Sequence, residues 1–250
     1  MAYRCPFCYV QAGFLKYAAL EIPEILECIK SVREPYDIIF VSGDTDSFGP
    51  PRTERGLALL RALLQFGVDL LFTTRALLND DHLRELEDIN DSCRSRGRRV
   101  FAYVSVAQLH HPHLEPRPIA SPYESIAQLG RFKANGLISV LALRPFLPNV
   151  PVEEYLEIIK LAQTNADIVV GEIWYADQAG KMDERVFEGA PANYPFTLKQ
   201  IDFDENEEVW KVFEGKNIEA SAAPLCADLN LPFFMRSRPA IEWARRKLAN

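Results

Sequence analysis

The chain has 250 residues, of which 48% are hydrophobic and 25% charged, and its formal net charge is −7. This length and apolar content are enough to bury one sizeable core, so we expect one main globular unit. The acidic balance argues against duplex DNA as a partner, because phosphate binding relies on lysine and arginine. The longest apolar runs have the length of a strand, which excludes a helix that crosses a membrane.

The cysteines and the start of the chain predict a cytoplasmic protein. The five cysteines are odd in number and mostly scattered, which is not the pattern of a disulfide framework. The first residues do not combine a charged region, an apolar segment and a small-residue cleavage site, so no export signal is recognised. We therefore expect reduced thiols and no contact with a membrane.

The first feature in chain order is the segment Cys5-Pro6-Phe7-Cys8. Two thiols three residues apart can both reach one metal ion or cluster. The same spacing also occurs in thioredoxin-type redox pairs, which sit between a strand and a helix of a much smaller fold. Two cysteines without a function at a frayed end are a further alternative, so the segment alone decides nothing.

The following residues repeat a strand–helix pattern, in which a short β-branched run precedes 10 to 15 residues at helical spacing. In chain order we expect helix 21–32, strand 37–41, helix 53–66, strand 68–73, helix 80–96, strand 99–106, helix 123–135, strand 137–143, helix 152–165 and strand 167–173. The strands start 30 to 38 residues apart, which fits one strand and one crossover helix per unit. This spacing predicts an α/β fold with a parallel sheet.

Glycines mark the ends of three expected helices. Gly67, Gly97 and Gly136 each follow a helix end, where a residue in the left-handed conformation is favoured. Asn79 and Ser121 stand where helix N-caps are expected.

After Tyr175 the repeat fades. We expect residues 1–176 to form a barrel-like domain and residues 177–250 an extension packed on it. Within the extension, residues 231–235 are a candidate short strand that leads into a last helix at 238–248. The acidic stretch 202–208 is expected to be a solvated face.

Polar residues follow each expected strand, and active sites of parallel α/β proteins gather at these carboxyl ends. The polar ends are Ser42-Gly43-Asp44-Thr45-Asp46, Thr73-Thr74-Arg75, Ser105 to Gln108, Arg144-Pro145 and Glu172 to Asp177. We expect these groups to line one cavity, although any one of them suits an ordinary solvent-facing loop as well.

A second cluster is His110-His111-Pro112-His113 with Glu115. Imidazoles and carboxylates are zinc and iron ligands, but neighbouring histidines in an extended loop point to opposite sides. We favour a loop that faces a substrate over a metal site. The roles of these three histidines and of Cys226 stay open.

With these features, the sequence resembles the radical S-adenosylmethionine (SAM) superfamily, most closely its branch around spore photoproduct lyase. That family carries Cys-x-x-x-Cys-x-aromatic-Cys after its first strand, and residues 5–9, Cys-Pro-Phe-Cys-Tyr, are similar to the second half of that motif. Residues 39–46, 70–75 and 104–105 look like the strand ends that follow. The resemblance spans about residues 5–176.

The resemblance implies a partial (β/α)6 TIM-like barrel that binds a [4Fe–4S] cluster and S-adenosyl-L-methionine. It implies that Cys5 and Cys8 are cluster ligands and that Phe7 packs near the adenine. The remaining implied cofactor contacts are Ser42, Gly43 and Asp44 at the methionine end, with Thr73, Ser105 and Arg144 as further candidates. A reductant such as a flavodoxin or ferredoxin is implied as partner, and a small molecule, peptide or modified residue as substrate.

One departure from the family pattern stands out. The position four residues before Cys5 is Met1, so the first cysteine and the first strand of the family are absent from this sequence. A start set downstream of the true one and a paralogue that has lost its full cluster are the two explanations, and we favour the first. Absence of that strand leaves an exposed edge at strand 37–41.

Three functions therefore stay open. The leading hypothesis is a radical SAM enzyme, and the alternative is a truncated or decayed barrel that binds a ligand or partner without an intact cluster. A phosphate-binding barrel enzyme is disfavoured, because no glycine-rich anion loop precedes a late helix.

Overall fold

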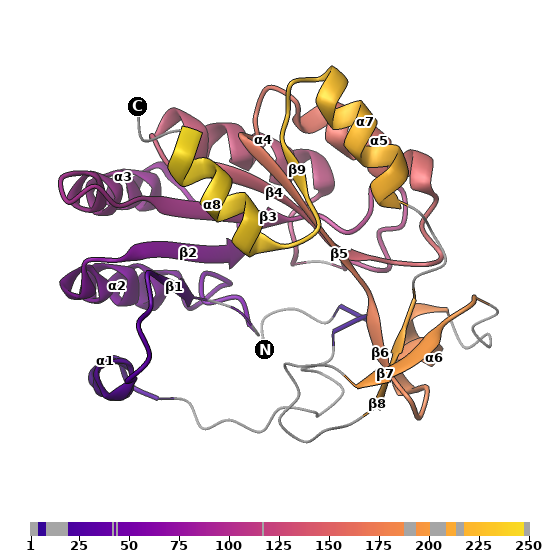
Figure 1. Ribbon diagram of the computed structural model, residues 1–250, viewed down its shortest axis with the longest axis horizontal. Helices are drawn as coiled ribbons and strands as arrows, with labels where there is room; N and C mark the ends of the chain where they lie inside the picture. The colour runs from indigo at the N-terminus through magenta and orange to yellow at the C-terminus, as the bar shows by residue number, and fades with distance from the viewer. Residues whose placement is uncertain are drawn as a thin grey trace.

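The computed structural model describes residues 5–8, 20–41, 43, 45–116, 118–187, 194–200, 209–213 and 218–247. Its centre is a sheet of six parallel strands in the order β1-β2-β3-β4-β5-β9 (Figure 1). The strands are β1 Ile38–Val41, β2 Asp69–Thr74, β3 Val100–Ser105, β4 Ile138–Phe146, β5 Ile168–Ile173 and β9 Phe233–Phe234. Among the described strands β1 and β9 are the two edges, so the sheet forms an open, partial barrel.

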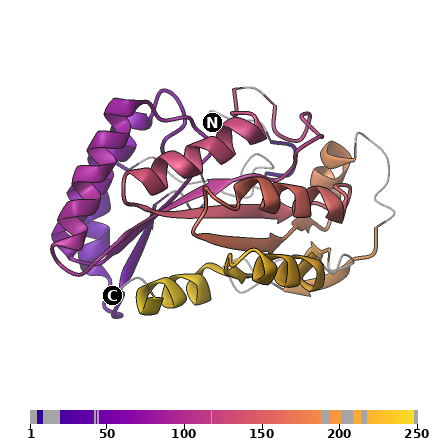
Figure 2. The same ribbon diagram turned by 90° about the horizontal axis from the view of Figure 1, so that it is seen from above.

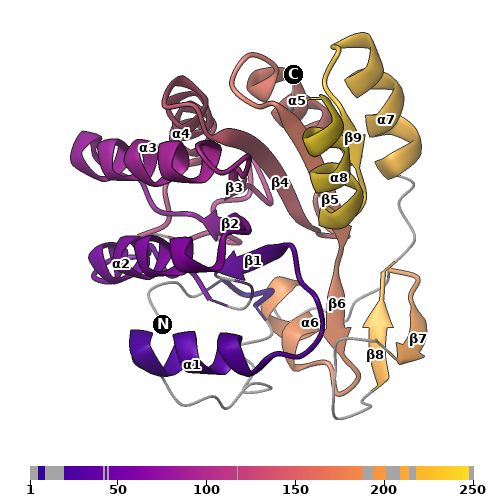
Figure 3. The ribbon, with the colours of Figure 1, turned by 60° about the vertical axis from the view of Figure 1, so that its left-hand side comes forward.

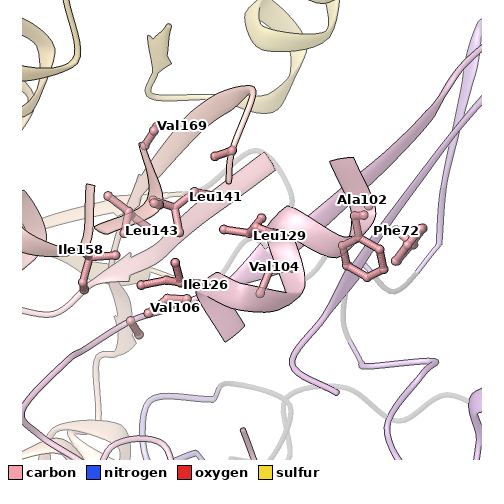
Figure 4. Close-up of a cluster of buried hydrophobic side chains, with 14 of the residues drawn as sticks. Phe72, Ala102, Val104, Val106, Ile126, Leu129, Leu141, Leu143, Ile158 and Val169 are labelled. Atoms are coloured by element: carbon pink, nitrogen blue, oxygen red, sulfur yellow. The ribbon is translucent and has the colours of Figure 1, made fainter. Parts of the chain in front are cut away.

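Helices cover the outer face of this sheet. They are α2 Thr53–Leu63, α3 Asp80–Arg94, α4 Pro122–Ala134 and α5 Val152–Ala162, and α1 Ile22–Ser31 packs against α2. Apolar residues of the strands and of α2 to α5 form one large core, and Figure 4 shows Leu129 of α4 between Leu141 on one side and Ala102 and Phe72 on the other. Burial of these side chains is the main source of stability, because each removes apolar area from water.

The repeat predicted from the sequence is confirmed, with element ends that differ by a few residues. Gly67, Gly97 and Gly136 have positive φ angles of 64°, 70° and 74°. Asn79 and Ser121 cap α3 and α4 by accepting a hydrogen bond from the backbone N–H of the third residue of each helix. The helix ends could thus be predicted from local chemistry.

The inner face of the sheet is covered by the last helix, α8 Ser237–Lys247. Its Ala240, Ile241 and Ala244 pack against alternate strand residues such as Leu71 and Tyr103 in a second buried cluster. Figure 2 shows this yellow helix on the opposite side of the sheet from the pink helices. Because side chains alternate along a strand, the residues two positions beyond Leu71 and Tyr103 share the α8 side of the sheet.

A smaller antiparallel sheet extends beyond β5. It has the strand order β6-β8-β7 and lies below the main sheet in Figure 3. Its strands are β6 Tyr175–Asp177, β7 Thr197–Gln200 and β8 Val209–Val212, and helix α6, Lys181–Val186, follows β6 in the chain. This sheet was not predicted, because its strands have only three or four residues and β7 is exposed throughout.

The end of the chain returns to the main sheet. Helix α7, Ile218–Asp228, packs against α5, and β9 pairs with β5, which confirms the short strand expected at 231–235. The division at residue 176 stays a prediction. The acidic stretch 202–208 lies outside the described residues, and no helix within the described ranges is long and apolar enough to span a membrane.

Candidate functional site

The Cys5–Cys8 turn is held at the carboxyl end of β5. The turn closes with a hydrogen bond from Cys8 N to Cys5 O of 3.1 Å. Two side chains donate hydrogen bonds to the backbone of the turn. Trp174 Nε1 donates to the Phe7 carbonyl at 3.4 Å, and Arg185 Nη2 donates to the Cys8 carbonyl at 3.4 Å. In Figure 1 the turn is the short indigo segment beside the start of β6.

Arg75, at the end of β2, joins the turn to the neighbouring strands. Its guanidinium carbon lies 5.3 Å from the centroid of the Phe7 ring, a cation–π contact. Its Nη2 donates to Ser105 Oγ at 2.7 Å and to the Arg144 carbonyl at 3.1 Å, and its Nη1 pairs with Glu115. The turn therefore lies on the same edge of the sheet as the polar ends of β2, β3 and β4.

Asp46 brings the end of β1 to the same place. Its carboxylate accepts hydrogen bonds from Arg75 N at 2.7 Å, from Phe48 N at 2.8 Å and from Thr74 Oγ1 at 3.0 Å. Burial raises the pKa of Asp46, and these hydrogen bonds oppose the shift.

The two thiols of the turn are free and close to a cation. Cys5 is buried and Cys8 is half-buried. Burial raises the pKa of Cys5, the charge of Arg75 opposes that shift, and the neighbouring Cys8 adds to it. The charge of Arg75 and the neighbouring Cys8 thus act in opposite directions on the Cys5 thiol.

The turn fits part of the donor set of an iron–sulfur cluster. Two thiols from one turn beside a guanidinium suit a group with thiolate ligands and net negative charge. Within the described ranges, no third histidine, cysteine, aspartate or glutamate joins them as a metal ligand. Cys28, Cys93 and Cys226 belong to α1, α3 and α7 instead. The described residues thus offer two candidate thiol ligands at this turn, one fewer than the motif of the family that the sequence resembles.

The side chains of Thr73 and Arg144 lie on the inner face of the sheet, on the α8 side. Thr73 Oγ1 is buried and has no hydrogen-bond partner among the described residues. Arg144 Nη2 donates to Ser237 Oγ at 2.6 Å, its Nε lies 3.4 Å from Glu172 Oε2, and its guanidinium carbon is 5.5 Å from the centroid of the Tyr103 ring. A buried hydroxyl without a partner is uncommon and calls for a ligand or water.

The remaining cofactor candidates from the sequence are Ser42, Gly43, Asp44 and Ser105. Ser42 and Asp44 lie outside the described residues, and Gly43 is exposed, with an added Cβ meeting only the Phe40 ring at 3.8 Å. Ser105 Oγ, besides accepting from Arg75, donates to the Arg144 carbonyl at 3.1 Å. The Ser105 hydroxyl is thus used within the protein.

The histidine loop is organised by Glu154, at the start of α5. Glu154 Oε1 accepts a hydrogen bond from His110 N at 2.9 Å, and its Oε2 lies 3.0 Å from His111 Nδ1. Burial alone would raise the pKa of Glu154, but hydrogen bonds from Leu109 N, His110 N and His111 hold it below its ordinary value. Within the described part of the chain these histidines form no cluster of three metal-ligating side chains.

Three residues of polar segments named from the sequence make contacts at the site that the sequence did not predict. Arg75 belongs to the polar end of the second expected strand, but only the fold shows its contact with Phe7. Trp174 and Glu115 are drawn in from distant segments, and no local pattern marks their contacts.

Parallel strands with helices on the outer face, and a cysteine turn at their carboxyl ends, define a partial α/β barrel with a candidate metal site. The model of the radical SAM superfamily matches residues 2–162. The chain belongs to the radical SAM superfamily, as the sequence predicted. A search of curated proteins found no match.

Solved structures confirm the fold. A spore photoproduct lyase variant with bound AdoMet and dinucleoside spore photoproduct is 14% identical with a TM-score of 0.69, over 93% of this chain and 72% of that chain. Streptococcus suis SuiB bound to S-adenosylmethionine is 12% identical with a TM-score of 0.56, over 94% of this chain and 48% of that chain. At these identities the likeness shows the fold alone, and the chain spans about half the length of SuiB.

Proposed function

We propose that this chain is a radical SAM enzyme that holds a [4Fe–4S] cluster through Cys5 and Cys8 and binds S-adenosyl-L-methionine at the carboxyl ends of the strands. Once reduced, a cluster held by Cys5 and Cys8 would supply the one electron that splits S-adenosyl-L-methionine into methionine and a 5′-deoxyadenosyl radical, and that radical would abstract hydrogen from a substrate. Membership in the superfamily and the AdoMet-bound structures of the same fold support this proposal.

One observation carries the proposal. The Cys5–Cys8 turn lies on the edge of the sheet where β1 to β5 end, because Trp174, Arg185 and Arg75 hold it there. A turn on the opposite edge would separate the thiols from Thr73 and Arg144 by the length of the strands. The thiols, Thr73 and Arg144 belong to the same edge of the sheet, which supports a cofactor shared between them.

We assign roles to the side chains that face this edge. The guanidinium of Arg144 suits the carboxylate of the cofactor or of a substrate, since its planar fork matches that group. The partnerless hydroxyl of Thr73 offers a donor or acceptor on the inner face. Phe7 would pack near the adenine, and Ser42, Gly43 and Asp44 would contact the methionine end. Ser105, whose hydroxyl is already used, would act by positioning Arg75.

The substrate is proposed only by class: a small molecule, a peptide or a modified residue. A spore photoproduct lyase structure of the same fold contains a dinucleoside spore photoproduct. The net charge of −7 disfavours a long duplex, because few cations remain to neutralise phosphates. A flavodoxin or ferredoxin would supply the electron, and a cytoplasmic location would suit such a partner.

A barrel without an intact cluster is the second candidate function. The observation in its favour is that the described residues supply two cysteine ligands and no third protein ligand. A cluster held by two thiolates needs a substitute ligand, so such a protein would bind a ligand or partner without radical chemistry.

Anaerobic reconstitution with iron and sulfide separates the two candidates. We expect the chain to bind about four iron and four sulfide per molecule and to turn brown, as a [4Fe–4S] site requires. The double substitution Cys5→Ser with Cys8→Ser should abolish this uptake, while Cys28→Ser, an exposed cysteine on α1, should leave it unchanged. Equal iron in all three proteins, or none in the parent chain, would reject the proposed cluster site.

A further inference from the structure

Arg75 carries a buried positive charge beside the two cysteines. Its side chain is 13% exposed, and that of its ion-pair partner Glu115 is 4% exposed. Glu115 comes from the loop between β3 and α4 and is fixed in turn, because its Oε2 accepts hydrogen bonds from Ala107 N at 3.3 Å and Gln108 Nε2 at 3.2 Å. Charges with this little solvent around them are weakly screened, so they act strongly on neighbouring groups.

We propose that the Arg75–Glu115 pair positions the Cys5–Cys8 turn and sets the reduction potential of the iron–sulfur cluster held there. This inference rests on the proposed function. Reduction adds a negative charge to the cluster, so a nearby cation stabilises the reduced form and raises the potential. Arg75 therefore raises the potential, and Glu115, which compensates part of that charge, lowers it.

The contacts of Arg75 explain how its side chain can position the turn and keep its charge beside the cysteines. The Phe7 ring lies under the guanidinium, and Phe7 stands between the two cysteines, so Arg75 fixes the middle of the turn. Hydrogen bonds to Ser105 Oγ and the Arg144 carbonyl prevent the guanidinium from swinging toward solvent. Asp46 is the second carboxylate at this place, and it holds the backbone N–H of Arg75.

The test is the cluster potential, measured by redox titration with electron paramagnetic resonance on the reconstituted full chain. Arg75→Gln should lower the potential relative to the parent chain, and Glu115→Gln should raise it. Arg75→Lys keeps the charge but not the fork, so its potential should stay nearer the parent value than that of Arg75→Gln.

Matched controls come from the opposite edge of the sheet. Lys133 and Asp167, which precedes β5, form an ion pair with Nζ to Oδ1 of 3.1 Å. Lys133→Gln and Asp167→Asn remove charges of the same signs and should leave the potential unchanged. These controls correct for the change in total charge.

Opposite shifts for Arg75→Gln and Glu115→Gln would support the proposal. Equal potentials in the variants and controls would overturn it, and so would shifts of both variants in one direction, which is the result of a loosened turn. If Arg75→Gln does not take up iron, the cluster potentials of Arg75→Lys and Glu115→Gln still test the proposal. Failure of the parent chain to bind iron would instead reject the proposed function.

Discussion

Trp174 is the residue that connects the cysteine turn to the small antiparallel sheet. Its indole is 2% exposed and stacks on Phe213, with ring centroids 4.9 Å apart, while its Nε1 donates to the Phe7 carbonyl. An aromatic ring locked by a stacking partner loses little further freedom when it also donates a hydrogen bond. Trp174 thus holds the backbone of Phe7, whereas Arg75 contacts the Phe7 ring.

Replacing Trp174→Phe tests this anchor. Phenylalanine keeps much of the ring packing but has no N–H, so the carbonyl of Phe7 loses its donor. We expect a loss of about 0.5–1.5 kcal/mol in stability and faster alkylation of the buried Cys5 in the metal-free protein. Mass spectrometry of Cys5 after timed iodoacetamide exposure measures that rate. Trp243→Phe on α8 is the control, and equal rates in both variants would show that Trp174 does not hold the turn.

At the scale of elements, α8 closes the inner face of the sheet and is fixed at both ends. Near its start, Ser237 Oγ accepts a hydrogen bond from Arg144 on β4. Near its end, Arg245 pairs with Asp37, which precedes β1, and its Nε donates to Asp69 Oδ2 on β2 at 2.6 Å. The helix therefore runs antiparallel to the strands, between their two edges.

Arg245→Ala should destabilise the protein much more than Arg246→Ala. Asp69 is 2% exposed, and loss of Arg245 leaves its carboxylate, among the residues that the structure describes, with the Arg99 N–H as its hydrogen-bond donor. A hydrogen bond to a buried charge contributes about 1.5–3 kcal/mol, whereas Arg246 is exposed on the same helix and should contribute close to nothing. Urea denaturation at pH 7 measures both values. Equal stabilities would contradict the role given to this end of α8.

The ion pair between Arg245 and Asp37 predicts that stability depends on pH. A hydrogen bond from Arg245 holds the pKa of Asp37 below its ordinary value of 3.8. The ionised form is therefore favoured in the folded state, so this stabilisation is present above pH 3.8 and is lost as the pH falls through the lowered folded pKa. Because Asp37 is mostly exposed, we expect less than about 1 kcal/mol.

Denaturation of the parent chain and Asp37→Asn at pH 7 and at pH 3 measures this effect. The difference in stability between the two proteins should be larger at pH 7 and should shrink in high salt, which screens exposed pairs. A difference that is constant with pH would show that Asp37 does not titrate with folding.

At the scale of the molecule, the repeat of strands and helices was predictable because residues close together in the sequence determine each strand and each helix end. Buried strands such as β2 read as continuous apolar runs, and Gly67 or Asn79 mark helix ends by backbone chemistry alone. The small sheet was missed, because its strands are short and gain stability from contacts between Trp174 and Phe213 that lie 39 residues apart in the chain.

The candidate site was predictable only in part, for a related reason. The spacing of Cys5 and Cys8 is visible in the sequence, and so are the polar strand ends. The residues that bring them together are not, since Trp174 contacts the turn across 167 positions of the chain. Such long-range contacts leave no local periodicity, so the fold must be known before they are found.

Cleavage of S-adenosyl-L-methionine tests the central claim most directly. The reconstituted chain is incubated with this cofactor and dithionite, and 5′-deoxyadenosine and methionine are quantified by chromatography. We predict that both products form in equal amounts and that neither forms with Cys5→Ser and Cys8→Ser combined. Cofactor that remains intact beside a fully loaded and reduced cluster would contradict the assignment of radical SAM chemistry to this chain.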